Sequence, residues 1–296
     1  MAVYLTKIKS FREKKAMEIV KKPYYRYDND VAFEGAKGCL RIYIPTDRGY
    51  VNFNIVHSVS EADFADVYRL GKAFAYDDNF SGEFELTPGR AEWDMAIKID
   101  WRDDFIGGLV HGDEISGELL AVVDGDKKDI ISATELTPFT EMILSVDSIG
   151  YDPADHTTKA LIHTKIYTVN SNGITLKQRV EFLGDYSLKN SYLAMMPPSK
   201  THTDAYLTDI NHTPTKIEGT VKDENVKSVT VFGTESGISF TMRIPEYPAL
   251  NGGNQLFIQD NGGRSYNKMY FPVCTDAKVK LGDVWNSVTE YEIKIK

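Results

Sequence analysis

The segment TKALIHTKIYTVNSNGITLKQRVEFLGDYSLKNSY, residues 158–192, decides the fold class of this chain. Its side chains alternate with the two-residue period of a β-strand, which places every second residue on the same face. In its middle, Asn172-Gly173 is the dipeptide that best supplies the two positive φ angles of a type I′ turn. The segment therefore predicts a β-hairpin with a two-residue loop.

One face of this hairpin collects polar side chains of four kinds. With Asn172-Gly173 as the loop, the predicted facing pairs are Val169 with Leu176, Tyr167 with Gln178, Lys165 with Val180, and His163 with Phe182. Imidazole, ammonium, phenol and carboxamide groups on one face could carry out proton transfer. The exposed face of an antiparallel sheet is also normally polar, so a solvated surface is the alternative.

The same period recurs along the rest of the chain. Alternation is clearest over residues 93–101, and further strands are predicted at 39–45, 51–55, 116–123, 139–150, 226–233, 238–244, 254–259, 267–273 and 289–295. Helical patterns occur only at 9–21 and 60–73, the second with Phe64, Val67 and Leu70 at helical spacing. Many strands without βαβ alternation predict an all-β fold, a large antiparallel β-sandwich with few short helices.

The domain organisation follows from the absence of a low-complexity linker. We expect residues 1–296 to form a single large sandwich domain, with residues 1–38 as an N-terminal extension. The stretch 197–225, rich in Pro, Thr and Lys, is the most loop-like and a candidate sub-boundary. Two smaller β domains that meet there are the alternative.

Composition restricts the classes of partner. The chain is 42 % hydrophobic and 26 % charged, with a net charge of −9, which argues against a general nucleic-acid binder. No apolar run reaches the length of a membrane span, and residues 1–22 show no secretory signal. We therefore expect a soluble protein, either cytoplasmic or virion-associated and released by lysis. Cys39 and Cys274 lie in apolar runs and predict two buried free thiols, with a disulfide as the alternative.

A second concentration of polar residues lies in the loop WRDDFIGGLVHGDE, residues 101–114. Its three glycines permit backbone shapes that other residues avoid, and loops between strands often carry sites. We expect His111 to be oriented by Asp113 or Glu114, as a catalytic base requires. The alternative is a glycine-rich turn whose acids cap backbone N–H groups and pair with Arg102.

Motifs for metals, cofactors and nucleophiles are missing from the sequence. His111, Asp113 and Glu114 could ligate a metal, but they lack the spacing of known metal motifs, so no metal site is predicted. Phosphate-binding and dinucleotide fingerprints are absent, and no cofactor is predicted. No Gly-x-Ser-x-Gly marks a nucleophilic serine.

The residue set fits β-elimination on a uronic-acid polysaccharide best. This reaction needs a group that neutralises the substrate carboxylate, a base for the C5 proton and an acid for the leaving oxygen. We predict His111 and His163 as the base or neutralising pair, and Tyr167 or Tyr192 as the acid. The predicted substrate contacts are Trp101, Arg102, Asp113, Glu114, Lys165, Gln178 and Arg179.

From about residue 90 to its end, the chain resembles β-sandwich polysaccharide lyases and galactose-mutarotase-like carbohydrate enzymes. The resemblance rests on the strand 163–167, the loop 108–114, and the C-terminal stretches 270–272 and 285–291. It implies a carbohydrate-active enzyme with a polysaccharide substrate, such as a phage tail-associated depolymerase. A non-catalytic carbohydrate-binding or virion structural module, a glycoside hydrolase and a sugar epimerase are the alternatives. The oligomeric state is open, an oligomer included.

Overall fold

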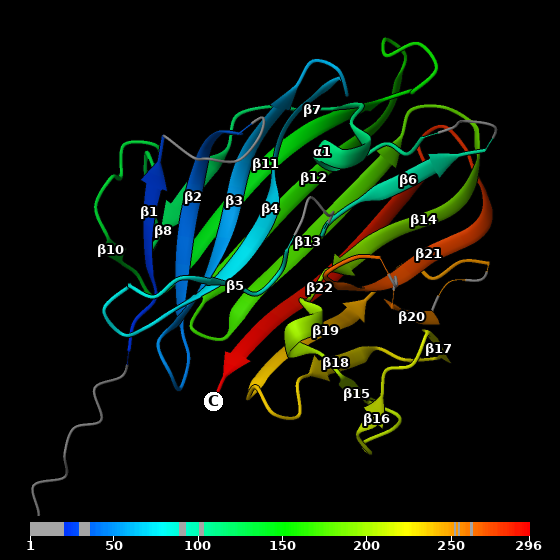
Figure 1. The fold of residues 1–296 in the computed structure, drawn as a ribbon. Helices are drawn as coiled ribbons and strands as arrows, with labels where there is room; N and C mark the ends of the chain where they lie inside the picture. Colours follow the sequence, from blue (N-terminus) through cyan, green and yellow to red (C-terminus); the bar gives the residue numbers. More distant parts are fainter. Residues whose placement is uncertain are drawn as a thin grey trace, which may run out of the picture.

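The computed structural model describes residues 21–29, 36–88, 93–100, 104–251, 253, 255–260 and 263–296. In this part of the chain, two mostly antiparallel sheets face each other as a sandwich (Figure 1). The predicted all-β sandwich is therefore confirmed. No helix among these residues is both long enough and apolar enough to cross a membrane.

The larger sheet contains 17 strands of the described chain. Their bounds are β1 (Tyr24–Asp28), β2 (Ala36–Pro45), β3 (Tyr50–Ser60), β4 (Ala65–Tyr76), β5 (Phe84–Glu85), β7 (Glu114–Ser116), β8 (Leu120–Val123), β9 (Asp126–Lys127), β10 (Thr137–Pro138), β11 (Met142–Tyr151), β12 (Lys159–Asn170), β13 (Gly173–Phe182), β15 (Ala205–Thr208), β16 (Thr215–Lys216), β18 (Ser228–Phe232), β19 (Ile238–Glu246) and β22 (Val284–Ile295).

Strand pairing joins these elements into one surface. The spatial order is β10-β1-β2-β3-β4-β7-β11-β12-β13-β22-β19-β18-β15-β16. Strand β5 is attached to β4, β8 to β11, and β9 to β8. Among these pairs only β4–β7 is parallel, and this short contact connects the N-terminal strands to the central ones.

The smaller sheet packs against the middle of the larger one. Its spatial order is β17 (Thr220–Glu224), β20 (Gln255–Asp260), β21 (Asn267–Val279), β14 (Tyr186–Met196) and β6 (Ala96–Ile99). A short helical turn, α1 (Gly108–His111), follows β6, and a 3-10 turn, η1 (Lys200–His202), follows β14.

The hydrophobic core fills the space between the sheets. Met196, Phe271 and Ile258 project from the smaller sheet and belong to the same buried cluster as Leu144 and Phe240 of the larger sheet. Each such side chain contributes about 1.5–3 kcal/mol when it leaves water. The period-two pattern is the consequence, because one face of each strand must meet this core.

The predicted helix at 60–73 is wrong, because this region forms a tight turn and then strand β4. Opposite Phe53 and Ile55 of β3, the partners on β4 are Ala73 and Leu70, so β4 carries one extra residue at a bulge. Leu70 and Ala73 therefore both reach the core although they are three residues apart. The spacing of Phe64, Val67 and Leu70 has another origin: Phe64 lies in the turn, with φ 50°, and Val67 and Leu70 are both buried on β4. Residues 9–20 of the other predicted helix lie outside the described residues.

The β12–β13 hairpin has a different register from the predicted one. Asn170 pairs with Gly173, so the loop is Ser171-Asn172, and each facing pair is displaced by two residues. The observed pairs are Val169 with Ile174, Tyr167 with Leu176, Lys165 with Gln178, and His163 with Val180. A displacement of two preserves the faces, whereas a displacement of one would have exchanged them. Gly173 is needed instead for close packing, since a Cβ there would lie 2.3 Å from the carbonyl oxygen of Tyr291.

The N-terminal extension over residues 1–38 stays a prediction. Strand β1 lies within residues 1–38, yet it pairs with β2 along its whole length. Both sheets combine strands from before and after residues 197–225; β22, for instance, lies between β13 and β19. We keep the single domain as a prediction. Cys39 and Cys274 are buried free thiols, as predicted, and burial raises the pKa of Cys39 to about 12.

Candidate functional site

The polar face of the β12–β13 hairpin is buried against the smaller sheet. The exposed fraction is 0 % for His163 and Tyr167, 1 % for Lys165 and 3 % for Gln178. Gln178 donates from Nε2 to the carbonyl oxygen of Leu193 on β14, at 2.6 Å. The alternative of an ordinary solvated face is therefore wrong.

Lys165 lies between two buried carboxylates. Its Nζ is 3.3 Å from Asp94 Oδ2 and 3.4 Å from Glu114 Oε1, and it donates to the carbonyl oxygen of Tyr68 at 2.9 Å. The hydroxyl of Tyr167 donates to Asp94 Oδ2 at 3.3 Å. Burial by itself lowers the pKa of Lys165, but the attraction of Glu114 and Asp94 outweighs it, so the net direction is upward. Lys165 is therefore a buried cation.

Glu114 is the matching buried anion. Burial by itself raises the pKa of its carboxyl, but the charge of Lys165 and the hydrogen bond from His163 hold this pKa well below its ordinary value. The Ser148 hydroxyl also donates to Glu114 Oε1. His163 contacts Glu114 Oε1 through Nδ1 and Gln178 Oε1 through Nε2, both at 3.1 Å. Asp94, Glu114, His163, Lys165, Tyr167 and Gln178 together form what we call the buried cluster.

Asp94 is a member that sequence reasoning missed. Strict alternation placed it on the outer side of its strand, opposite Trp93 and Met95. In the structure Trp93, Asp94, Met95 and Ala96 are all 2 % exposed or less, because both sides of this segment are covered. Alternation carries no information about a segment buried on both sides, so no local signal identified Asp94.

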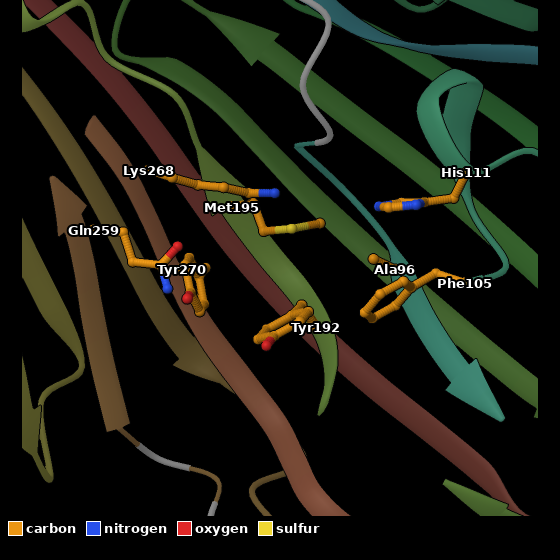
Figure 2. A pocket seen from close by; sticks show the side chains of 8 residues that line it. All are labelled: Ala96, Phe105, His111, Tyr192, Met195, Gln259, Lys268 and Tyr270. Carbon is orange, nitrogen blue, oxygen red and sulfur yellow. The ribbon is translucent and has the colours of Figure 1, made fainter. Parts of the chain in front are cut away.

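A pocket lies on the other face of the smaller sheet (Figure 2). Tyr270 and Met195 line it, whereas their chain neighbours Phe271 and Met196 point into the core. The pocket has a volume of about 210 Å³. Its lining consists of Ala96, Phe105, His111, Tyr192, Met195, Gln259, Lys268 and Tyr270.

Four aromatic rings, here called the aromatic row, cross this face from β20 to the loop after β6. Phe257 stacks on Tyr270 with centroids 5.4 Å apart, and Tyr270 meets Tyr192 edge-on at 4.8 Å. Phe105 follows Tyr192 at 6.4 Å and lies 4.7 Å from the ring of His111. Adjacent strands are about 4.8 Å apart, so a row across several strands is longer than one small ligand.

Cations accompany the aromatic row. Lys222 Nζ lies 5.3 Å from the centroid of Phe257, and Lys98 Nζ lies 5.2 Å from that of Phe105. Lys268 lines the pocket between them. Three lysines therefore lie along the aromatic row of a chain whose net charge is −9.

His111 is the residue in the pocket best suited to accept a proton. Its Nδ1 lies 2.8 Å from Asp104 Oδ1, and a carboxylate can only accept, so Nδ1 carries the proton. Nε2 is then the basic nitrogen of the neutral ring. Figure 2 shows His111 and Lys268 extending toward each other across the pocket, with the rings of Tyr192 and Phe105 beneath.

The predicted orienting partners of His111 are wrong. Asp113 Oδ1 instead bonds to His156 Nδ1, and Glu114 turns inward to the buried cluster. The peptide adopts a left-handed conformation at Asp113, with φ 54°, which directs these neighbouring acids to different partners. Burial raises the pKa of Asp113, against the opposing effect of His156.

The two tyrosines of the pocket keep their protons at neutral pH. Burial raises the pKa of Tyr270 to about 12 and raises that of Tyr192 as well. Neither hydroxyl has a hydrogen-bond partner among the described residues. Each is therefore a phenol that could donate a proton to a bound molecule.

The predicted residues thus separate into several places. His111 and Tyr192 share the pocket, while His163, Tyr167, Lys165, Gln178 and Glu114 belong to the buried cluster. Arg179 is on the opposite face of the hairpin and pairs with Glu181 at 2.8 Å. Trp101 and Arg102 lie outside the described residues.

Three polar lining residues, Gln259, Lys268 and Tyr270, were not predicted. They lie on β20 and β21, far in sequence from the loop at 101–114, and only strand pairing brings them to it. Within the described chain, no three His, Cys, Asp or Glu side chains are grouped so that they could hold a metal ion.

Comparison with known proteins shows likeness in structure but not in sequence. No protein-family model matches the sequence, and no curated protein matches it. A galactose mutarotase-like protein from Clostridium acetobutylicum superposes with a TM-score of 0.51 and 8 % identity, over 92 % of this chain and 99 % of that chain. This chain therefore shares the sandwich fold of that protein.

Two further solved structures are more distant. A galactose mutarotase-like protein from Lactobacillus casei has a TM-score of 0.40 and 10 % identity, over 86 % of this chain and 99 % of that one. A heparan sulfate lyase from Pedobacter heparinus has a TM-score of 0.43 and 11 % identity, over 87 % of this chain and 35 % of that one. None of the three is described as a phage protein.

Proposed function

We propose that this protein is a carbohydrate-active enzyme that cleaves an acidic polysaccharide by β-elimination at the pocket of the smaller sheet. One observation carries the proposal: the His111 imidazole and the Lys268 ammonium extend toward each other over a row of aromatic rings. The fold shared with a galactose mutarotase-like protein supports a saccharide as the ligand.

The chemistry assigns a role to each group. Lys268 neutralises the carboxylate of a uronic acid, which makes the C5 proton more acidic. His111, held by Asp104, removes that proton through Nε2, and the C4–O bond breaks as the C4–C5 double bond forms. The phenol of Tyr192 gives its proton to the leaving oxygen, and burial, which raises its pKa, keeps it protonated until that step.

The aromatic row supports a polymer as the substrate. Sugar rings present flat C–H faces, and aromatic side chains provide flat apolar surface for them. Lys98 and Lys222 at the two ends of the aromatic row favour an anionic chain. The five side chains of the buried cluster that we had predicted as catalytic or substrate-binding are 3 % exposed or less, so in this proposal they do not contact the substrate.

Ultraviolet absorbance tests the reaction. Incubation with a panel of uronate polymers should raise the absorbance of the new conjugated double bond, and His111→Gln should abolish this rise. His57→Gln is a matched control, because His57 pairs with Asp66 at 2.7 Å in the same way but does not line the pocket. New reducing ends without the absorbance would indicate hydrolysis instead and contradict the elimination.

The aromatic row also favours a second candidate, a non-catalytic carbohydrate-binding module. Such a module would bind the same polymers through the rings and leave them intact. In that case His111→Gln would leave the affinity for the polymer nearly unchanged, and no wild-type product would form. Isothermal titration with an acidic oligosaccharide, together with product analysis, separates the two functions.

A further inference from the structure

A buried contact links the buried cluster to the turn that carries His111. The backbone N–H of Gly108 donates to Glu114 Oε2 at 3.0 Å. Gly108 is the first residue of α1, and His111 is its last. The same turn is closed by backbone bonds from Gly107 N to Gly112 O and from Gly112 N to Gly108 O, each 3.0 Å long. Glu114 therefore holds the start of the turn from the interior.

The backbone of the α1 turn packs so closely on neighbouring segments that it has little room to move. A Cβ at Gly112 would lie 1.7 Å from the carbonyl oxygen of Asp63, and a Cβ at Gly107 would lie 2.4 Å from that of Met95. Both glycines have positive φ, at 76° and 135°. The backbone thus packs directly on its neighbours, and the position of His111 depends on the bonds that fix this backbone.

The hydrogen bonds of His163 define its charge. Gln178 donates from Nε2 to the Leu193 carbonyl, which can only accept, so Gln178 presents Oε1 to His163 Nε2. On the other side, His163 Nδ1 faces Glu114 Oε1, which already accepts from Lys165. Both partners are acceptors, so both ring nitrogens carry protons. His163 is then an imidazolium.

This charge balances the buried cluster. Lys165 and His163 supply two positive charges, and Asp94 and Glu114 supply two negative ones. Tyr167 is neutral, since burial and the charge of Asp94 raise its pKa well above the ordinary value. Buried charges persist only when they are paired and hydrogen-bonded, and with a neutral histidine one negative charge would have no counterpart.

We propose that Glu114 and a doubly protonated His163 are positioning residues that hold the α1 turn, and with it His111, over the aromatic row. This inference rests on the proposed function of His111. Glu114 acts through the backbone of Gly108, and His163 acts by keeping Glu114 ionised and oriented. Neither residue contacts the substrate.

Kinetics of Glu114→Gln on a cleaved polymer tests the effect on His111. A misplaced catalytic group costs on the order of 100-fold in rate, so kcat should fall by about that factor while KM stays within about twofold. Val231→Ala, a truncation of a fully buried side chain on β18, is the control for a general loss of stability. A change in KM alone, or an equal fall of kcat in both variants, would overturn the proposal.

Two measurements on the protein itself do not depend on any activity. Nitrogen-15 NMR of the wild type at pH 7.5 should show both His163 nitrogens protonated; a neutral ring there would overturn the proposal. Amide hydrogen exchange of Gly108 should be at least tenfold faster in Glu114→Gln than in the wild type, and unchanged protection would also overturn it. If no polymer is cleaved while His163 is doubly protonated and the Gly108 exchange is faster in Glu114→Gln, the proposed function fails and the positioning of the turn stands.

Discussion

The two polar regions of this protein, the buried cluster and the pocket with its aromatic row, lie on opposite faces of the smaller sheet and differ in how their groups are satisfied. In the buried cluster every charge has an opposite charge within 3.4 Å, and its side chains are almost entirely inaccessible. In the pocket, the hydroxyls of Tyr192 and Tyr270 have no partner among the described residues.

Because of this difference, the buried cluster is suited to stabilising the fold and the pocket is suited to binding a ligand. Groups that satisfy one another inside a protein stabilise a single arrangement and have no capacity left for a ligand. Groups that lie at a surface beside apolar rings can exchange water for a ligand at small cost. The α1 turn connects the two regions, because Glu114 binds its first residue and His111 is its last.

The largest expected effect concerns the buried cation. Lys165→Met leaves Asp94 buried without a counter-charge in the cluster and Glu114 with His163 alone, which should lower the free energy of unfolding by about 3–5 kcal/mol. Urea unfolding measures this loss. Lys189→Met is the control, since Lys189 forms a solvent-exposed pair with Asp276. Equal destabilisation by both variants would contradict the contrast between the two regions.

The pH dependence of stability should reveal the ionised Glu114. Its pKa is depressed in the folded state, so its contribution is complete above the unfolded value of 4.5 and is lost as the pH falls toward the folded value. One such group adds a slope of about 1.4 kcal/mol per pH unit in that window.

Urea unfolding of the wild type and of Glu114→Gln between about pH 6 and about pH 3.5, which is about one unit below the unfolded pKa of 4.5, measures this slope. The wild type should lose stability more steeply below pH 4.5 than the variant. Parallel curves would show that Glu114 is not a buried anion.

The smallest expected effect lies in the aromatic row. Tyr270→Ala removes a ring that stacks on Phe257 and meets Tyr192, and we expect roughly fivefold to tenfold weaker binding of an acidic oligosaccharide, with little change in stability beyond the lost packing. Tyr270→Phe keeps the ring and should bind nearly as the wild type does. Isothermal titration calorimetry measures these affinities. Unchanged affinity in Tyr270→Ala would show that the aromatic row is not part of the binding site.

Sequence reasoning succeeded where one local rule acts alone. The period of two identified the strands and placed His163, Lys165, Tyr167 and Gln178 on one face, because a strand alternates wherever one side meets a core. It failed on register, where the position of Gly173 reflected packing against Tyr291 and not the turn. It also predicted a helix over β4, because Phe64, Val67 and Leu70 have helical spacing although Phe64 lies in a turn and the other two are buried on a strand.

The candidate site was predicted only in part. His111 and Tyr192 were identified, since a glycine-rich loop and a tyrosine near the end of an apolar strand are visible locally. Lys268 across the pocket could not be inferred, because β21 reaches the His111 loop only through pairing between distant strands. Asp104 lies in the same loop as His111, but only the folded loop decides that Asp104, and not Asp113 or Glu114, is its partner.

The sequence by itself determined that this chain is an antiparallel β-sandwich and that four polar groups share a hairpin face, since alternation and chain chirality are properties of neighbouring residues. Only the tertiary structure decided that this polar face of the hairpin is buried. The smaller sheet lies over it, and this burial turns His163, Lys165 and Glu114 into a closed ionic network. The same sheet exposes its other face, where rings from β14, β20 and β21 meet the His111 turn, because pairing between distant strands places them there.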